Sequence, residues 1–377
     1  MNLFLIIKII ILKIIRLNLS FIKREISGYP ETVKKFEKNF ANFIGKDYGI
    51  TFCNGTSAIE AAIYALGFKH GDEILVPSSN FHSSLGPIKN LNYKPIFVDI
   101  DKQSITIDCT DLKKKITNKS KGLLIIHPFG YPCNMDEVLK IVKENNLKLI
   151  EDCSHAHGAL YDNKKIGSFS DISCFSLQGG KAIAAGEGGI SLTNNKKYFL
   201  RMSIYGHFNR HENELIDDID LKKYSKTGIS KKLRAHPLGI SLATVDFENL
   251  KKLNNCKEKI YNKIDQILLK YETVNSIKLN EKSLRGGMFG GYPIIFDDIT
   301  KLNEIEGSFK KFKIILKPYP WLAHHKMEIY SESKCILPIT DKVIDHCHMI
   351  IIPQLLNFNF KNLEKCLLEC KKNNLIL

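Results

Sequence analysis

A regular alternation of short apolar runs with helical patterns between residues 47 and 193 limits the fold of this 377-residue chain more than any other feature. The apolar runs have the length of buried strands, and the segments between several of them carry apolar residues at helical spacing. Strands that alternate with helices in this way indicate an α/β domain with a mostly parallel sheet. Strands are predicted over residues 47–53, 73–77, 95–99, 122–127, 148–152, 172–177 and 189–193, and helices over 32–43, 57–66, 83–91 and 135–145.

The alternation weakens after about Ala243, and the rest of the chain predicts a smaller C-terminal α+β domain. We expect long helices over residues 247–253 and 257–271, a strand near 290–296 and a final helix over 360–372. The chain is therefore divided into an N-terminal helix (1–24), a large domain (25–250) and a small C-terminal domain (251–377).

The N-terminal stretch, residues 3–22, holds fifteen apolar residues, interrupted by two polar residues and by the cations Lys8, Lys13 and Arg16. It is long enough to cross a bilayer. However, each cation near the helix centre costs about 2.5–3.5 kcal/mol, against about 0.3–0.6 kcal/mol gained per Leu, Ile or Phe. The cations share one side of the helix, opposite a wide apolar face, which is typical of a helix in the membrane interface. Attachment to a membrane surface is therefore preferred over packing on the protein or across a dimer, and spanning is the least favoured alternative.

Charge and cysteine content narrow the class of partner and compartment. The formal net charge of +15 fits nucleic acid, an anionic membrane surface or phosphorylated substrates, but a lysine-rich bias spread over solvated faces is the preferred explanation. No aromatic-interleaved basic motif or Cys/His finger is present, so no nucleic-acid partner is expected. The ten cysteines accompany no signal-peptide pattern, which indicates a reducing, cytoplasmic compartment. No metal site is expected either, because His346 and His348 lack a second ligand pair at zinc spacing.

Three polar elements follow predicted strands, at the edge where α/β sheets bind ligands. Residues 54–57 (Asn-Gly-Thr-Ser) open a helix and offer N–H groups and hydroxyls to an anion, although they also suit an ordinary helix cap. Asp152 ends a strand and precedes His155; alone, such a carboxylate is more often a loop cap. Lys181 follows the strand that carries Ser176, and a desolvated lysine there is a Schiff-base nucleophile. The order of all three elements favours a catalytic site over an isolated cap and a surface lysine.

These motifs resemble those of the DegT/DnrJ/EryC1/StrS family of sugar aminotransferases that depend on pyridoxal 5'-phosphate (PLP). The resemblance covers about residues 28–250, in FCNGTSAIEAAIYALGFKHGDEILVPSSNF, PIFVDID, LIEDCSHAHGALYDNKKIGSFSDISCFSL and GKAIAAGEGG. It implies the PLP-dependent transferase fold type I. In that fold a large, mostly parallel sheet has helices on both faces, and a smaller α+β domain follows it.

The resemblance also implies a role for individual residues. Lys181 would form the Schiff base with PLP and shuttle a proton, and Asp152 would keep the pyridine nitrogen protonated. Phe81 stands where family members stack an aromatic ring on the coenzyme, and His155 stands near the position of its phenolic oxygen. The residues implied to hold the phosphate are Gly55, Thr56, Ser57 and Ser176, with Arg234 reaching over from a neighbouring subunit. A homodimer with shared active sites is therefore expected.

The activity implied is transamination. Glutamate is the expected donor and a keto-sugar on a nucleotide carrier the acceptor, in cell-surface polysaccharide or glycan biosynthesis. One alternative is a sugar dehydratase on the same scaffold, but that branch has His in place of the Schiff-base lysine, whereas this chain has Lys181. Another alternative is a non-catalytic, membrane-tethered member of the family. The presence of Lys181, Asp152 and Ser176 together argues against it. Residues 1–22 lie outside this machinery, and we expect them to hold a cytoplasmic enzyme at the inner membrane face.

Overall fold

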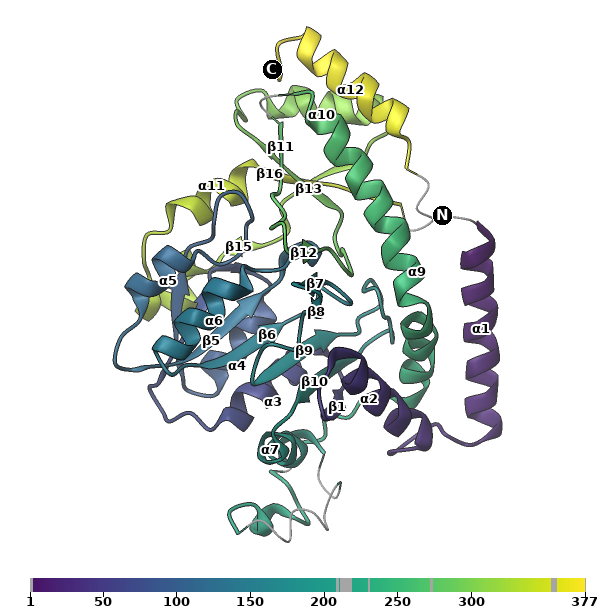
Figure 1. Ribbon diagram of the computed structural model, residues 1–377, viewed down its shortest axis with the longest axis vertical. Helices are drawn as coiled ribbons and strands as arrows, with labels where there is room; N and C mark the ends of the chain where they lie inside the picture. The colour runs from purple at the N-terminus through teal and green to yellow at the C-terminus, as the bar shows by residue number, and fades with distance from the viewer. Residues whose placement is uncertain are drawn as a thin grey trace.

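The computed structural model describes residues 3–207, 210, 219–229, 231–271, 274–353 and 358–376. At its centre lies a seven-stranded sheet in the order β1-β10-β9-β6-β5-β2-β4 (Figure 1). The strands are β1 (Tyr48–Phe52), β2 (Glu73–Pro77), β4 (Lys94–Val98), β5 (Ser120–Ile126), β6 (Lys148–Asp152), β9 (Ile172–Ser176) and β10 (Gly189–Thr193). Every pair is parallel except those that β10 makes with β1 and β9. The prediction of a mostly parallel sheet is confirmed.

Helices cover both faces of this sheet because its strands bury side chains on each side. In β6, Leu149 packs into one hydrophobic core and its neighbour Ile150 into the other, as the alternation along a strand requires. The helices on the Ile150 side are α3 (Gly55–Leu66), α4 (Gly86–Asn90) and α7 (Lys196–Gly206). Those on the Leu149 side are α2 (Glu31–Ile44), α5 (Cys109–Lys115) and α6 (Met135–Glu144).

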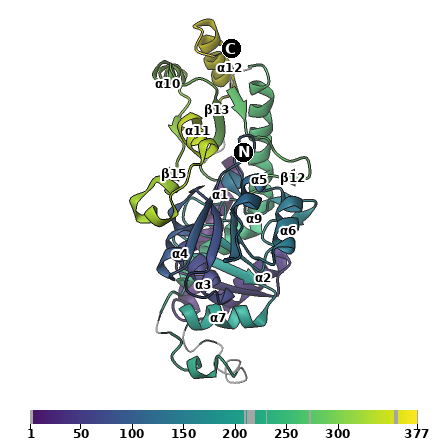
Figure 2. The same ribbon diagram turned by 90° about the vertical axis from the view of Figure 1, so that its left-hand side faces the viewer.

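The C-terminal unit, at the top of Figures 1 and 2, is built on an antiparallel sheet in the order β11-β13-β16-β14. Its elements are β11 (Val274–Ser276), β13 (Tyr292–Phe296), α10 (Leu302–Lys311), β14 (Leu316–Pro318), α11 (Pro338–His346), β16 (Cys347–Ile350) and α12 (Phe360–Lys372). Two short strand pairings join it to the large unit: β15 (Leu322–Ala323) with β3 (Ser79–Asn80), and β12 (Ser283–Leu284) with β7 (Leu160–Tyr161), which also pairs with β8 (Lys164–Lys165). Short 3-10 segments are η1 (His82–Ser84), η2 (Pro128–Gly130), η3 (Lys222–Tyr224), η4 (His324–Lys326) and η5 (Glu328–Ser333).

A single helix, α9 (Pro237–Leu268), joins the two units where the sequence predicts two helices. The predicted break falls near Asn254, and asparagine is a poor helix former. In the structure the Asn254 side chain donates to the His157 carbonyl (2.8 Å) and accepts the Gly287 N–H (3.0 Å), so tertiary contacts stabilise a continuous helix. The domain boundary at residue 250 lies inside α9 and stays a prediction.

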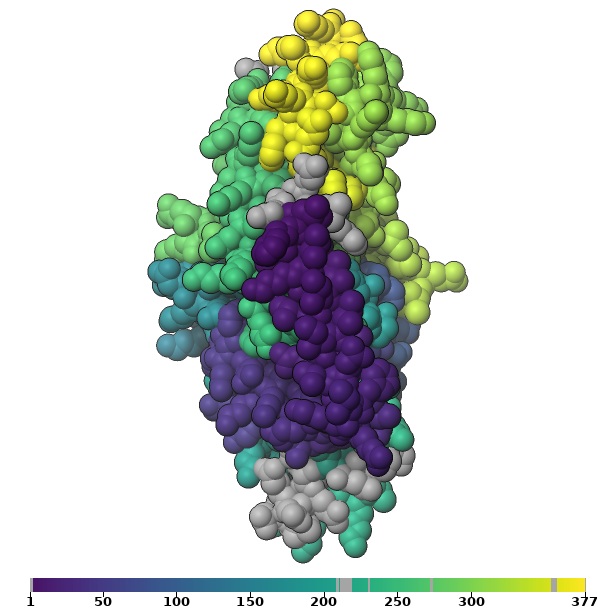
Figure 3. Space-filling view, turned by 90° about the vertical axis from the view of Figure 1, so that its right-hand side faces the viewer, coloured from purple at the N-terminus to yellow at the C-terminus, as the bar shows by residue number. Residues whose placement is uncertain are grey.

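The N-terminal helix α1 (Leu3–Ile22) packs along α9 at the edge of the molecule (Figures 1 and 3). Of its three cations, Lys8 is exposed, whereas Lys13 and Arg16 are turned toward α9. The Lys13 Nζ lies 2.8 Å from a carboxylate oxygen of Asp246, and Arg16 lies 2.7 Å from Glu248. Among the described helices, none is long and apolar enough to cross a bilayer.

Candidate active site

A cavity of about 530 Å³ opens at the carboxyl edge of the large sheet. Its volume lies within the range of small-molecule sites, about 300–1,000 Å³. It is lined by Ile126, Asp152 and Ser176, the last residues of β5, β6 and β9, and by the start of α3. Residues of the C-terminal unit complete the lining. The cavity therefore occupies the edge at which parallel sheets bind ligands.

Lys181 lies in the turn between β9 and β10 and lines the cavity. Its Nζ is 3.7 Å from the centroid of the Phe289 ring. Burial lowers the pKa of Lys181 from 10.5 to about 8, and the Asp152 carboxylate opposes this shift only in part. A much larger share of this amine is therefore neutral near pH 7 than for a surface lysine, and the neutral amine is the nucleophilic form.

The pH dependence of Lys181 modification tests this shift. We expect its reaction with trinitrobenzenesulfonate to rise through a midpoint near pH 8, because the neutral fraction grows as the pH passes the pKa. Asp152→Asn removes the carboxylate that raises this pKa, so the midpoint should move to lower pH. Peptide mass spectrometry measures each lysine separately, and surface lysines supply the control. A midpoint near 10.5 at Lys181 would contradict the lowered pKa.

Asp152 is buried at the end of β6 and held by two hydrogen bonds. Its Oδ2 accepts the Ser84 hydroxyl (2.7 Å), and its Oδ1 accepts the Ser154 backbone N–H (3.0 Å). These bonds fix the carboxylate in the cavity lining. A carboxylate held in this way can accept a charge-assisted hydrogen bond from a protonated ring nitrogen.

The start of α3 forms a cradle for an anion. Asn54 caps the helix by accepting the Ser57 N–H at 2.8 Å. Gly55 and Thr56 occupy the first two helical positions, whose N–H groups have no helical acceptor and can bind a ligand anion. A Cβ on Gly55 would lie 2.9 Å from the Ser176 Cβ, so glycine is needed for the helix start to approach the end of β9.

His155 lines the cavity as a neutral imidazole. Its Nδ1 accepts the backbone N–H of Phe129 at 3.3 Å, which assigns the ring proton to Nε2. Burial, and secondly the neighbouring Lys181, hold the pKa of His155 well below its ordinary 6.5. His155 therefore offers an Nε2–H donor without carrying a charge.

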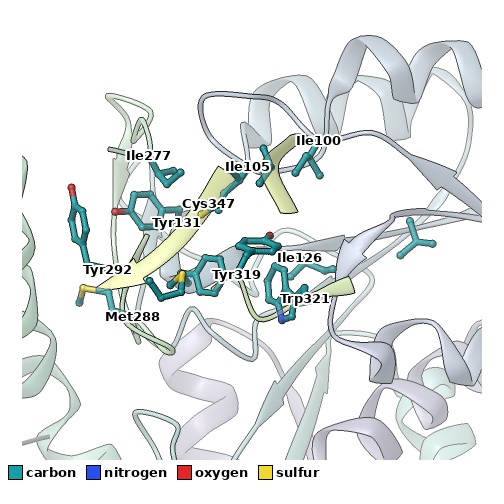
Figure 4. Close-up of a cluster of buried hydrophobic side chains, with 14 of the residues drawn as sticks. Ile100, Ile105, Ile126, Tyr131, Ile277, Met288, Tyr292, Tyr319, Trp321 and Cys347 are labelled. Atoms are coloured by element: carbon teal, nitrogen blue, oxygen red, sulfur yellow. The ribbon is translucent and has the colours of Figure 1, made fainter. Parts of the chain in front are cut away.

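Sequence reasoning missed the aromatic wall of the cavity. The Phe129 and Trp321 rings are stacked with centroids 4.8 Å apart, and the His155 ring lies 4.8 Å from that of Phe289. Trp321 belongs to the buried cluster that joins the two units, where it lies with Tyr319 (Figure 4). This wall places aromatic rings on the side of the cavity that faces Lys181.

Phe289 is presented by a glycine-rich segment, residues 285–291, of the C-terminal unit. Gly287 has a φ of +72°, and a Cβ there would lie 2.4 Å from the His155 carbonyl oxygen, so only glycine fits. Arg285, which begins the segment, is buried and paired with Glu258 (3.1 Å) and Asp265 (2.9 Å). The density of glycines was a signal in the sequence that this segment approaches another backbone closely.

The described lining contains seven of the nine predicted site residues: Gly55, Thr56, Phe81, Asp152, His155, Ser176 and Lys181. Ser57 and Arg234 do not belong to it. The Ser57 N–H is bonded to Asn54, and its hydroxyl lies 3.4 Å from the Cys53 Sγ. Arg234 lies just before α9 in the chain.

Behind the site lies His127–Glu151–Cys153, the single cluster of potential metal ligands within the described ranges. Glu151 accepts the Ser170 N–H (2.9 Å), and the His127 Nε2 lies 3.3 Å from its Oε1. Burial raises the pKa of Glu151, but the nearby His127 and the backbone N–H donors of residues 167 and 170 outweigh burial and leave it below its ordinary value. Because its oxygens are already bonded, Glu151 anchors β6 and thereby positions Asp152.

Comparison with known proteins identifies the family. A model of the DegT/DnrJ/EryC1/StrS aminotransferase family matches residues 23–361. The chain belongs to this family. The match begins after α1 and includes both the cavity-lining residues of the large unit and the aromatic wall.

Known relatives agree with this family and fold. GDP-perosamine synthase from Escherichia coli O157:H7 is 41% identical over 176 residues, 47% of this chain and 48% of that protein. The chain thus spans about half the length of the curated relatives it matches.

Two solved structures show the fold. The aminotransferase from Psychrobacter cryohalolentis has a TM-score of 0.86 at 19% identity, with 96% of each chain covered. GDP-4-keto-6-deoxy-D-mannose-3-dehydratase from E. coli, solved with hydrated PLP, has a TM-score of 0.81 at 19% identity, covering 90% of this chain and 92% of that one. The predicted fold type is confirmed.

Proposed function

We propose that this chain is a PLP-dependent aminotransferase that moves an amino group, with glutamate as the expected donor, to a keto-sugar on a nucleotide carrier. The observation that carries the proposal is Lys181, a buried amine with a lowered pKa that shares the cavity with Asp152. Family membership and the similarity to GDP-perosamine synthase support a nucleotide-sugar acceptor. Such a product would serve cell-surface polysaccharide or glycan synthesis.

The cavity residues fit PLP group by group. The N–H groups of Gly55 and Thr56 and the Thr56 and Ser176 hydroxyls suit the phosphate, since a helix start favours an anion. The Asp152 carboxylate suits a protonated pyridine nitrogen, and Phe81 at the rim supplies a flat apolar surface for the ring. Bound PLP supplies an electron sink that stabilises negative charge on the substrate carbon.

Each group of the cavity has a separate role in the proposed reaction. Lys181 would hold the coenzyme covalently, and its Nζ would be the group that moves a proton at the substrate carbon. Asp152 would hold a proton on the ring nitrogen, and the neutral His155 would offer its Nε2–H to an oxygen of the ring. The apolar rings of the aromatic wall lower the local dielectric constant, which strengthens the charge interaction of Asp152.

A homodimer is part of the same proposal. The phosphate of PLP carries negative charge, but in the described lining the cations are Lys181 and Lys317 alone. Lys181 is used to bond the coenzyme, and Lys317 comes from the C-terminal unit. Arg234 does not line the cavity of its own chain, and from a second copy its guanidinium would supply a bidentate partner for the phosphate.

Coenzyme binding can be followed through Trp321, the sole tryptophan of the chain. We expect PLP to quench its fluorescence, because Trp321 lines the cavity. Thr56→Val should weaken PLP binding by about tenfold or more, the effect of losing a hydrogen bond to a charged group. Ser57→Ala, whose hydroxyl contacts Cys53 instead, is the matched control and should bind as the unaltered chain does. Equal PLP affinities for the unaltered chain and both variants would contradict the assignment of Thr56 to the phosphate site.

The acceptor is tested with the enzyme loaded with the amine form of the coenzyme. Nucleotide-linked keto-sugars are added in turn, and mass spectrometry follows the sugar product. A product with an amine in place of the carbonyl, together with return of the aldehyde form of the coenzyme, supports transamination. Loss of water from the sugar without a stable amino-sugar would favour the dehydratase alternative. No reaction with any keto-sugar would overturn the proposed acceptor class.

A further inference from the structure

The outward face of α1 is an unusually apolar surface. Of the twelve exposed residues of this helix, ten are large apolar side chains: Leu3, Phe4, Ile7, Ile10, Ile11, Ile14, Ile15, Leu19, Phe21 and Ile22. Each is between 44% and 77% exposed. At 100° per residue they share one side of α1, the apolar strip, and α1 lies on the surface of the molecule (Figure 3). A contiguous apolar strip of this kind marks an interaction site rather than ordinary surface.

Polar side chains on the opposite side of α1 already contact α9. Lys13 and Arg16 are paired with Asp246 and Glu248 of α9. The buried Ser20 hydroxyl lies 2.7 Å from that of Ser241, also on α9. These contacts fix the rotation of α1 about its axis. The contacts with α9 therefore keep the apolar residues facing outward. Rotating the helix to bury these residues would break both ion pairs.

The charges around this strip favour an anionic surface. Residues 3–22 contain no Asp or Glu. The exposed Lys8 interrupts the outward residues, and the exposed Lys23 and Arg24 follow the helix directly. Lysine and arginine next to an apolar face attract the anionic headgroups of a bilayer.

A second copy of the chain fits the strip less well. A helix of 20 residues is about 30 Å long and about 10 Å wide. A partner seated on α1 alone would then bury roughly 300 Å² on each side, whereas a stable interface needs about 800 Å² per partner. In both views α1 stands at the edge of the molecule, packed on α9 (Figures 1 and 3).

We propose that the outward face of α1 inserts into the interfacial region of a bilayer that carries anionic headgroups. The helix lies parallel to the membrane plane, and its apolar strip enters the boundary between headgroups and acyl chains. Lys8, Lys23 and Arg24 contact the phosphates. The ion pairs to α9 transmit this attachment to the large unit, so the whole enzyme is held at the surface.

Vesicle binding by the full chain loaded with PLP tests the proposal. We expect it to sediment with vesicles of phosphatidylcholine containing phosphatidylglycerol, and to bind vesicles of phosphatidylcholine alone at least about tenfold more weakly. Ile11→Gln combined with Ile14→Gln should lower binding by more than about tenfold, because both exposed side chains leave the apolar strip. Deletion of residues 1–22 is a poorer test, because it uncovers Asp246 and Ser241 on α9.

The matched control is Leu269→Gln combined with Ile336→Gln, which removes two exposed apolar side chains elsewhere. It should bind vesicles as the unaltered chain does. Retention of PLP by each variant shows that it is folded, and this readout is independent of the sugar acceptor. The proposal is overturned if the unaltered chain fails to bind either vesicle, or if the control loses as much binding as the α1 variant. It is overturned in favour of a contact between copies if the α1 variant changes the sedimentation of the protein without lipid while vesicles do not bind.

Discussion

Replacement of Lys181 by alanine is expected to abolish covalent attachment of PLP and to lower transamination by about 10²–10⁴-fold or more, since a proton-transfer group is lost together with the nucleophile. The measurement is borohydride reduction of the PLP-loaded protein followed by peptide mass spectrometry. The unaltered chain should gain the mass of the reduced coenzyme at residue 181. The Lys181→Ala variant should gain none, while the Thr56 and Ser176 cradle still binds PLP without a covalent bond.

Lys257 is an internal control for this experiment. It is also a buried lysine, and burial lowers its pKa to about 8. Its Nζ donates to the Gly287 carbonyl at 2.8 Å, and it does not line the cavity. The two lysines therefore share a lowered pKa and differ in access to the coenzyme. A reduced adduct at Lys257, or one that persists in Lys181→Ala, would show that the lysine assignment is wrong.

Asp152→Asn is expected to retain PLP but to lower turnover by about 10²–10³-fold, the range for losing one strong electrostatic contribution to the transition state. The amide can no longer hold a proton on the pyridine nitrogen, so the coenzyme becomes a poorer electron sink. The rate of a half-reaction with glutamate, followed by the coenzyme spectrum, measures this step directly. Near-normal turnover would contradict the role of Asp152.

Ser84→Ala is the control for Asp152→Asn. It keeps the carboxylate and removes one of its two hydrogen bonds, the one from the Ser84 hydroxyl at 2.7 Å. A loss of about tenfold or less is expected, because the Ser154 N–H still holds the other oxygen. If Ser84→Ala lowered turnover as much as Asp152→Asn, the contribution of Asp152 would depend on the position of its carboxylate rather than on its charge.

The sequence by itself was sufficient to predict the strands of the large sheet and most of the residues that the large unit contributes to the cavity lining. Strands β2, β6 and β10 have the predicted bounds, because a buried strand is a local run of apolar residues. Asp152 and Ser176 could be placed in one site because parallel strands end at the same edge of a sheet. The roles of these residues, and of Lys181, rest on the resemblance to a family and not on spacing.

Tertiary structure alone placed the residues that come from distant parts of the chain. Phe289 and Trp321 follow Lys181 by more than 100 residues, and no local pattern brings them beside it. Their positions depend on the pairing of Arg285 with Glu258 and on the strand pair β3–β15. The continuity of α9 likewise depends on what Asn254 contacts.

The N-terminal helix shows most clearly which features the sequence predicts and which depend on tertiary contacts. Its period of apolar and basic residues predicts a helix with two unlike faces, and α1 has them. Which face turns inward was decided by Asp246 and Glu248, more than 200 residues away, because they bind the cations Lys13 and Arg16. Local periodicity determines where helices and strands form, since it depends on neighbours in the chain. The direction in which each face points depends on the partners that folding brings to it.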